Sequence, residues 1–283
     1  MDLIYEVLNK SREKSAVPTA THEILQQIVD ESVQNDFFQI ATPLPSLPSL
    51  HAVDIQPELV VDVRTIVENI SVDAIKNNAQ VIGFTSALEG EGVTTLASAT
   101  AQIMAEKSLP DDHFSTPADQ CREFGQITQH GVLIIDTQFR NPTLHHVFND
   151  SHDSGLIDIL THRASFSQIV RKVEQTNMSA LLFGSYNGHW SAPYSKNLKA
   201  VLLEIKSCFE TIILDMPPVL QNSASIDISR NCDGVIIIVH AGKTTSEQVN
   251  ETKSRLQDSG VRIIGTILNR HGNAIPQALS KLI

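Results

Sequence analysis

From about residue 60 onward, the hydrophobic and polar positions of this chain form two kinds of segment in alternation. Short apolar runs rich in β-branched residues have the profile of strands buried in a parallel sheet. Between them, apolar residues recur at the three- and four-residue spacing of amphipathic helices. The predicted strands are residues 81–84, 131–136, 178–183, 210–215, 234–239 and 261–268. The predicted helices are residues 60–77, a segment containing Leu96, Ala99 and Ile103, and residues 154–173, 197–207 and 245–259.

This alternation predicts an α/β fold with a doubly wound, mostly parallel sheet. Ahead of it, residues 1–13 and 21–33 place apolar side chains on one helical face, and residues 38–57 combine recurring prolines with serines in the manner of an extended linker. We therefore expect an N-terminal extension, residues 1–57, and a folded domain, residues 58–283. The first helix could dock on a partner or only cap the domain.

The stretch VIGFTSALEGEGVTTLASATAQIMAEK joins a predicted strand, a turn and a predicted helix. Gly90, Glu91 and Gly92 form the turn, and Thr94 and Thr95 supply hydroxyl groups where the helix begins. This order is typical of a P-loop, whose backbone N–H groups point at a phosphate. An ordinary glycine-rich junction would have the same pattern, so the loop alone leaves both interpretations open.

The P-loop pattern GxxxxGK[ST] is incomplete here, because Val93 stands at the lysine position and Ala87 at the position of the first glycine. That lysine brings a positive charge to the terminal phosphates, where fixed charges lower the barrier of phosphoryl transfer. The loop amides and the Thr94 hydroxyl remain. We therefore expect weak nucleotide or anion binding and impaired phosphoryl transfer.

Two aspartates, Asp136 and Asp215, each follow an apolar run. The carboxyl ends of parallel strands form the edge at which open α/β sheets bind ligands. An aspartate at this edge can hold the Mg²⁺ that bridges nucleotide phosphates, with a loop threonine as companion ligand. Either aspartate could instead be structural, so Thr94, Asp136 and Asp215 are a hypothetical metal set.

Together with their flanking residues, these features resemble the bacterial tyrosine kinases, the cytoplasmic P-loop module of polysaccharide co-polymerases, within the wider family of MinD-like ATPases. SALEGEGVTT resembles the Walker A motif, LIIDTQFRNPTLHHVF the family's second aspartate motif, and ETIILDMPPVL its Walker B motif. GLIDILTHRASFSQIV, DGVIIIVHAGKTTSEQV and RIIGTILNR are similar to its connecting segments. The resemblance implies a P-loop NTPase-like fold, ATP with Mg²⁺, and a role in making or exporting a surface polysaccharide.

The resemblance also implies roles for single residues. Thr94 would be a Mg²⁺ ligand, Asp215 the Walker B carboxylate and Asp136 the first acid of the second motif. Arg140 matches the arginine after that motif, and Asn269 would contact the nucleotide base. The implied nucleotide site comprises Gly90, Glu91, Gly92, Thr94, Thr95, Asp136, Arg140, Asp215 and Asn269.

Several departures from the family pattern bear on activity. Val93 replaces the phosphate-binding lysine and Gln138 stands where the family has its second aspartate, so two charges are lost. The tail RHGNAIPQALSKLI lacks the C-terminal tyrosine cluster that the family autophosphorylates. The family's assembly motif ExxRxxR keeps only its middle arginine, Arg64, which argues against a closed kinase ring and leaves other oligomers open.

Composition excludes other classes of protein. The formal net charge of −11, with no local cluster of lysine or arginine, argues against nucleic-acid binding. Cys121, Cys208 and Cys232 are far apart, so we expect reduced thiols. No apolar run approaches the ~18–20 residues needed to cross a bilayer, and charged residues interrupt the N-terminus where a signal peptide would be apolar. We expect a cytoplasmic protein, peripheral to the inner membrane through a partner.

Four further residues have more than one interpretation. His145 and His146 would face about 100° apart on a helix, so we expect surface or local contacts and no zinc site. Lys243 could substitute for the missing lysine, but it follows a different strand and solvent exposure is the favoured interpretation. Trp190 is predicted to pack in a loop or to contact a partner. The polar stretch after Lys107 is predicted to be a surface insertion.

The function that these observations favour is that of a catalytically impaired homologue of the bacterial tyrosine kinases. It would act in exopolysaccharide or capsular polysaccharide biosynthesis or export through contact with a membrane-embedded, Wzz-like co-polymerase. ATP or ADP with Mg²⁺ is the implied cofactor, and the loss of two charges weakens that expectation. One alternative is a working ATPase or tyrosine kinase in which another basic residue, such as Arg140, replaces the lysine. The other is a MinD-like positioning ATPase.

Overall fold

The protein is represented by a computed structural model that describes residues 49–53, 55, 57–107, 131–150, 153–185 and 192–270. These residues fall in one compact unit, residues 40–283. Its centre is a seven-stranded sheet in the order β3-β4-β2-β5-β1-β6-β7, parallel except for the pairing of β3 with β4. The predicted doubly wound fold is confirmed. The strands are β1 (Val81–Ser86), β2 (Gly131–Asp136), β3 (Arg171–Lys172), β4 (Met178–Leu181), β5 (Phe209–Asp215), β6 (Gly234–His240) and β7 (Ile263–Asn269).

Helices connect most of these strands. The helix at residues 246–258 begins with a capping box. The Thr245 hydroxyl accepts a hydrogen bond from the Gln248 N–H, and the Gln248 side chain accepts one from the Thr245 N–H. The helices of the described residues are α3 (Pro57–Asn77), α4 (Val93–Lys107), α5 (Leu144–Val147), α6 (Leu156–Leu160), α7 (Phe166–Ile169), α8 (Ala192–Ile205), α9 (Ala224–Ser229) and α10 (Ser246–Asp258).

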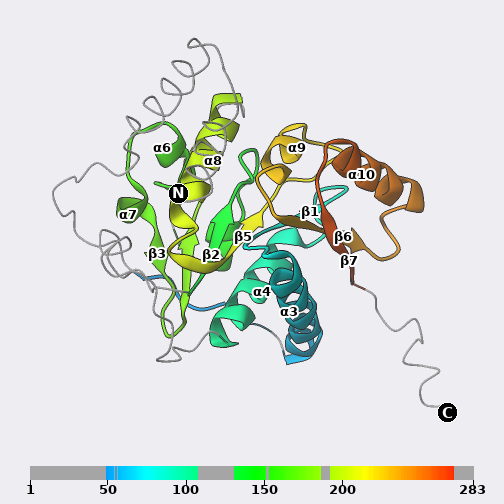
Figure 1. The fold of residues 1–283 in the computed structure, drawn as a ribbon. Helices are drawn as coiled ribbons and strands as arrows, with labels where there is room; N and C mark the ends of the chain where they lie inside the picture. Colours follow the sequence, from blue (N-terminus) through cyan, green and yellow to red (C-terminus); the bar gives the residue numbers. More distant parts are fainter. Residues whose placement is uncertain are drawn as a thin grey trace, which may run out of the picture. The chain divides into compact units, whose positions relative to one another are not determined.

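Apolar side chains cover both faces of the sheet, and β6 shows how. Its side chains alternate in direction, so Val235 and Ile237 pack with Leu256 of α10. Ile236 and Ile238 point to the opposite face, into the core shared with α3 and α4. Figure 1 shows α3 and α4 side by side, with α4 next to the sheet. Because both faces are covered, the strands read as continuous apolar runs, which made them predictable.

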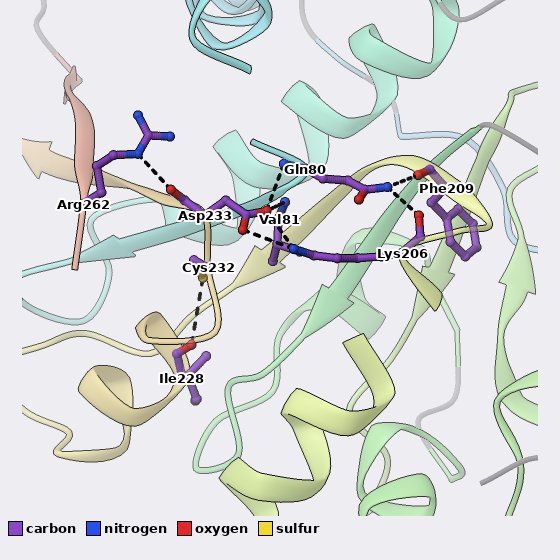
Figure 2. A network of polar contacts seen from close by, with 8 residues as sticks. All are labelled: Gln80, Val81, Lys206, Phe209, Ile228, Cys232, Asp233 and Arg262. Carbon is purple, nitrogen blue, oxygen red and sulfur yellow. Dashed lines mark hydrogen bonds and ion pairs between the residues drawn. The ribbon is translucent and has the colours of Figure 1, made fainter. Parts of the chain in front are cut away.

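At the amino-terminal ends of β1 and β6, on the side of the sheet away from the glycine loop, polar contacts around Asp233 join neighbouring strands (Figure 2). The Asp233 carboxylate accepts hydrogen bonds from the N–H groups of Gln80 (3.0 Å) and Val81 (2.8 Å), and pairs with the Lys206 ammonium at 3.0 Å. The Gln80 side chain donates to the carbonyl oxygens of Lys206 and Phe209, both at 2.5 Å. These contacts fix where β1, β5 and β6 begin, and hence where they end at the site.

The chain just before α3 contacts the domain. Leu50 is buried and makes an isolated parallel bridge to Val173, with its N–H donating to the Lys172 carbonyl at 2.9 Å. The Gln102 side chain of α4 holds Val53 by two hydrogen bonds, one to its N–H and one to its carbonyl. The end of the predicted linker therefore packs on the sheet. The predicted division between residues 57 and 58 stays a prediction.

The single helix predicted over residues 154–173 is wrong. The structure has α6, a turn, α7 and the short strand β3 in this range. His162 adopts a left-handed conformation with φ 57°, which ends α6, and Ser165 starts α7 with Gln168 in a capping box. Two short helices bury the apolar residues of this range, Leu156 and Ile159 on α6 and Phe166 and Ile169 on α7. Along the sequence, these residues are spaced as they would be on one continuous helix. Local capping signals decided the structure here.

Some predictions fall outside the described residues: the helices at residues 1–13 and 21–33, the insertion after Lys107, Cys121, Trp190 and the C-terminal tail. The two cysteines that are described, Cys208 and Cys232, are free thiols, as predicted. Burial and the nearby Asp233 carboxylate raise the pKa of the Cys232 thiol. No helix among the described residues combines the length and apolar character needed to cross a membrane.

Candidate nucleotide site

The glycine loop lies between the end of β1 at Ser86 and the start of α4 at Val93, as the sequence predicts. Gly90 and Gly92 have φ angles of +77° and +93°, in the left-handed region that favours glycine. A Cβ atom on Gly92 would stand 2.2 Å from the Asn269 Nδ2 atom, so the Asn269 side chain would have to shift. Glycine at 92 therefore allows both the turn and the close approach of β7.

A buried acid anchors this loop. Glu91 has no exposed surface, and its Oε1 atom accepts a hydrogen bond from the Thr244 hydroxyl at 2.5 Å. Its Oε2 atom accepts one from the Ala87 N–H at 3.2 Å, and its carbonyl accepts one from the Asn269 side chain at 2.8 Å. The loop is thus tied to the ends of β6 and β7. Thr244 was not predicted to belong to the site, and no pattern in the sequence marks it.

Val93 is the first residue of α4 and stands where a P-loop has its phosphate-binding lysine. It is only 7% exposed and packs in the hydrophobic core between α4 and the sheet, with residues such as Leu96 and Ala97. Thr94, the next residue, is partly exposed and Thr95 is exposed. The start of α4 therefore presents hydroxyls and amides but no charge of its own.

The two predicted aspartates lie side by side. β2 and β5 are neighbours, and Asp136 pairs in register with Asp215 at their carboxyl ends. Both are fully buried. Burial, and then repulsion from Asp215, raises the pKa of Asp136 well above its ordinary value. Burial likewise raises the pKa of Asp215 to about 7, although hydrogen bonds from Thr94 and Gln138 lower it.

Gln138 joins the glycine loop to Asp215. Its side-chain nitrogen, Nε2, lies 2.9 Å from the Thr94 hydroxyl oxygen and 2.8 Å from Asp215 Oδ1. Its backbone N–H donates to Asp136 Oδ1 at 2.8 Å. The sequence marks Gln138 only as a departure from a family pattern, and these contacts appear only in the fold.

The rest of the polar cluster is satisfied locally, with one exception. The Thr94 and Thr143 hydroxyls share a hydrogen bond of 2.8 Å, and Asp136 Oδ2 accepts from the Leu144 N–H at 3.2 Å. Asp215 Oδ2 is buried and has no hydrogen-bond partner among the residues that the structure describes. A buried carboxylate oxygen without a hydrogen-bond donor lowers the stability of the folded protein.

Several known proteins with similar sequences are tyrosine-protein kinases. The tyrosine-protein kinase YwqD of Bacillus subtilis is 26% identical over 207 residues, which are 73% of this chain and 78% of YwqD. The tyrosine-protein kinase ptk of Acinetobacter johnsonii is 32% identical over 139 residues, 49% of this chain but only 19% of ptk. The crystal structure of the VpsO kinase domain is 27% identical, with a TM-score of 0.61, over 75% of this chain and 95% of that domain.

The chain is a homologue of the bacterial tyrosine kinases. No family model matches it. The cell division ATPase MinD of Pyrococcus furiosus shares the fold, with 19% identity and a TM-score of 0.53 over 72% of this chain and 78% of MinD. The predicted relationship, a tyrosine kinase homologue with a MinD-like fold, is thereby confirmed. At 26–27% identity, the similarity to YwqD and to the VpsO kinase domain does not by itself assign an activity to this chain.

In a kinase of this fold, the predicted Mg²⁺ would lie between Thr94 and Asp215. Mg²⁺ needs oxygen ligands in near-octahedral geometry. Here an N–H donor group bridges these two oxygens, and the described residues contain no cluster of three or more His, Cys, Asp or Glu side chains able to hold a metal. The residues as arranged do not fit the metal, whereas a glycine loop that leads into the start of a helix is the kind of backbone that binds a phosphate.

Arg140 and Lys243 are the two cationic residues that the sequence offered as substitutes for the missing lysine. Arg140 is exposed on the loop after β2. Lys243 is exposed, as predicted, yet a Cβ atom on Gly90 would stand 3.9 Å from its Nζ atom. It reaches the glycine loop because β6 neighbours β1. Because Lys243 and Gly90 lie far apart in the sequence, this contact could not be predicted from it.

The two histidines were predicted to make surface or local contacts, and each alternative fits one of them. His146 is exposed, but His145 is only 8% exposed on α5, with its ring centroid 3.8 Å from that of His146. α5 follows the Asp136 motif and packs on α4, which buries the side of the helix that carries His145. The described residues hold no zinc site in which the pair could take part.

Proposed function

We propose that this chain is a catalytically impaired homologue of the bacterial tyrosine kinases that acts in exopolysaccharide or capsular polysaccharide biosynthesis or export. It works through contact with a membrane-embedded, Wzz-like co-polymerase, which would hold it at the inner membrane. The pathway and the partner come from the resemblance of the sequence to the family. The impairment comes from this chain's own residues.

One observation carries the impairment: the Gln138 side-chain nitrogen bridges Thr94 and Asp215. Phosphoryl transfer in P-loop enzymes depends almost entirely on fixed charges, namely a lysine and Mg²⁺. Val93 is buried in the core and supplies no charge, and an amide stands where the metal would bind. Both positive charges are therefore missing from the place at which charge develops on the transferred phosphoryl group.

A direct assay tests the impairment. The purified chain is incubated with radiolabelled ATP and Mg²⁺, and both phosphate release and protein-bound label are measured. We expect turnover at least ~100-fold below the 1–100 s⁻¹ typical of kinases. Turnover within the kinase range that is lost in Asp215→Asn would contradict the proposal.

A genetic assay tests the role in the pathway. Deletion of the gene is expected to reduce surface polysaccharide, and the wild-type gene to restore it. Asp215→Asn keeps the size and the Oδ1 acceptor of the side chain, so it is expected to restore polysaccharide fully, because no catalysis is needed. Failure of a stably expressed Asp215→Asn protein to restore polysaccharide would show that the carboxylate acts chemically.

The second candidate function is a working ATPase or tyrosine kinase of the same pathway, and the position of Lys243 favours it. Its Nζ atom approaches Gly90 and could take the role of the missing lysine. This candidate predicts turnover that is abolished by Lys243→Ala and kept in Lys253→Ala, an exposed lysine on α10 with the same change of charge.

A further inference from the structure

We propose that the carboxamide of Gln138 takes the place of Mg²⁺, so that the glycine loop binds a nucleoside di- or triphosphate without a divalent metal. This inference deepens the proposed function and rests on it. It concerns how the ligand is held, whereas the proposed function concerns whether the ligand is turned over.

The match between Gln138 and the metal position is geometric. A carboxamide nitrogen carries two N–H donors, and Gln138 Nε2 has two oxygens at hydrogen-bond distance, Thr94 Oγ1 at 2.9 Å and Asp215 Oδ1 at 2.8 Å. A threonine hydroxyl of the loop and a Walker B carboxylate are the pair of oxygens expected to flank Mg²⁺. One donor group therefore occupies the position that a cation would share with the same two partners.

The amide and the metal exclude each other. Mg²⁺ binds oxygen at about 2.0–2.1 Å and is not bound by an N–H donor, so Gln138 would have to leave before the ion could enter. Its backbone is held in place, because its N–H donates to Asp136 Oδ1 at 2.8 Å. Asp136 is itself held by the Leu144 N–H, and of the carboxylate oxygens of Asp136 and Asp215, both described by the structure, only Asp215 Oδ2 has no hydrogen-bond partner. A single oxygen does not make a magnesium site.

The phosphate charge then needs another cation. Lys243 is the lysine whose ammonium lies beside the loop, 3.9 Å from the Cβ position of Gly90. The backbone of its turn is fixed by two hydrogen bonds, because the N–H groups of Lys243 and Thr244 both donate to the His240 carbonyl, at 3.2 and 3.0 Å. The Thr244 hydroxyl ties the same turn to Glu91 of the loop. The turn that carries Lys243 is therefore joined directly to the glycine loop.

The test measures ATP and ADP binding to the full chain by calorimetry, once with EDTA and once with excess MgCl₂. We expect the wild-type dissociation constants to agree within about twofold, because no metal enters the site. Gln138→Asp and Gln138→Ala both remove the N–H donors, and each is expected to bind at least about tenfold more tightly with Mg²⁺ than with EDTA. Gln257→Asp, an exposed residue on α10 with the same change of charge, is expected to behave as wild type.

The same titrations in EDTA test the cation. Lys243→Ala is expected to weaken ATP binding about tenfold, and the control Lys253→Ala to leave it unchanged. Wild-type binding that tightens tenfold or more with Mg²⁺ would overturn the inference, and so would the absence of binding in both conditions. Neither outcome touches the proposed function, which is decided by turnover and by polysaccharide production.

Discussion

Gln138 Nε2 lies 2.8 Å from Asp215 Oδ1, although 77 residues separate the two along the chain. The contact exists because β2 and β5 are adjacent and end at the same level, where Asp136 pairs with Asp215. Gln138 follows β2 by two residues, so its side chain reaches over the end of β5 toward the glycine loop. An amide in this position satisfies one oxygen of a buried carboxylate that would otherwise need a cation.

The buried Val93 predicts a gain of affinity from one substitution. Val93→Lys adds a positive charge at the P-loop lysine position, and its long side chain can reach the phosphates from the start of α4. We expect ATP to bind about tenfold more tightly, the gain of one charge-assisted hydrogen bond, as measured by calorimetry. Val93→Met adds length without charge and is expected to bind as wild type. Equal affinities for Lys and Val at 93 would place the phosphates elsewhere.

Thr244 is predicted to hold the glycine loop through Glu91. Thr244→Val removes the hydroxyl that donates to the buried Glu91 Oε1 atom, which leaves a carboxylate oxygen unpaired. We expect the free energy of unfolding to fall by about 1–3 kcal/mol and hydrogen exchange at residues 87–92 to accelerate. Thr266→Val, at an exposed position of β7, is the control and should change neither. Unchanged exchange in Thr244→Val would show that the loop is held by other contacts.

Gly92 is predicted to be the more sensitive of two left-handed glycines. Gly260→Ala puts a Cβ into open space, so it carries only the left-handed strain of about 1 kcal/mol. Gly92→Ala carries the same strain and also places Cβ 2.2 Å from Asn269 Nδ2, so we expect a loss above about 2 kcal/mol. Urea unfolding of both variants measures the difference. Equal losses would mean that Asn269 moves aside without cost.

Asp233 is predicted to make stability depend on acid pH. Burial raises the pKa of Asp233, but hydrogen bonds from Val81, Gln80 and Lys206 outweigh it, so the pKa is lower in the folded protein than in the unfolded chain. The unfolded chain then binds more protons, and the stabilisation is complete above the ordinary value of 3.8 and disappears as the pH falls through the lowered pKa.

The variant that tests this is Asp233→Asn, compared with wild type by urea unfolding at pH 7 and pH 3. We expect a cost of about 1–3 kcal/mol at pH 7 and a smaller cost at pH 3, which lies below the ordinary pKa of 3.8, so that the unfolded chain binds a proton at this position and the carboxylate stabilises the fold less. Asp227→Asn removes one partner of the exposed pair with Arg230, and should cost little at either pH. An equal cost of Asp233→Asn at both pH values would mean that the charge of Asp233 is not what stabilises the sheet edge.

The sequence by itself determined the class of the fold and the location of the loop. Strands such as β2, β5 and β6 are buried on both faces, so nearly every residue in them is apolar and the run is visible in one dimension. Gly90, Gly92, Asp136 and Asp215 were also predictable, because turn geometry and strand ends demand particular residue types at fixed local spacing.

Only the tertiary structure decided which of these residues meet. The strand order places β2 beside β5, which brings Gln138 to Asp215. It also places β6 beside β1, which brings Thr244 to Glu91 and Lys243 to Gly90 from a distant part of the chain. Strand neighbours depend on how helices pack on both faces of the sheet, and no local spacing records that. The sequence alone therefore shows that Val93 stands at the position of the P-loop lysine. That the Gln138 amide lies between Thr94 and Asp215, where a metal ion would bind, is seen only in the tertiary structure.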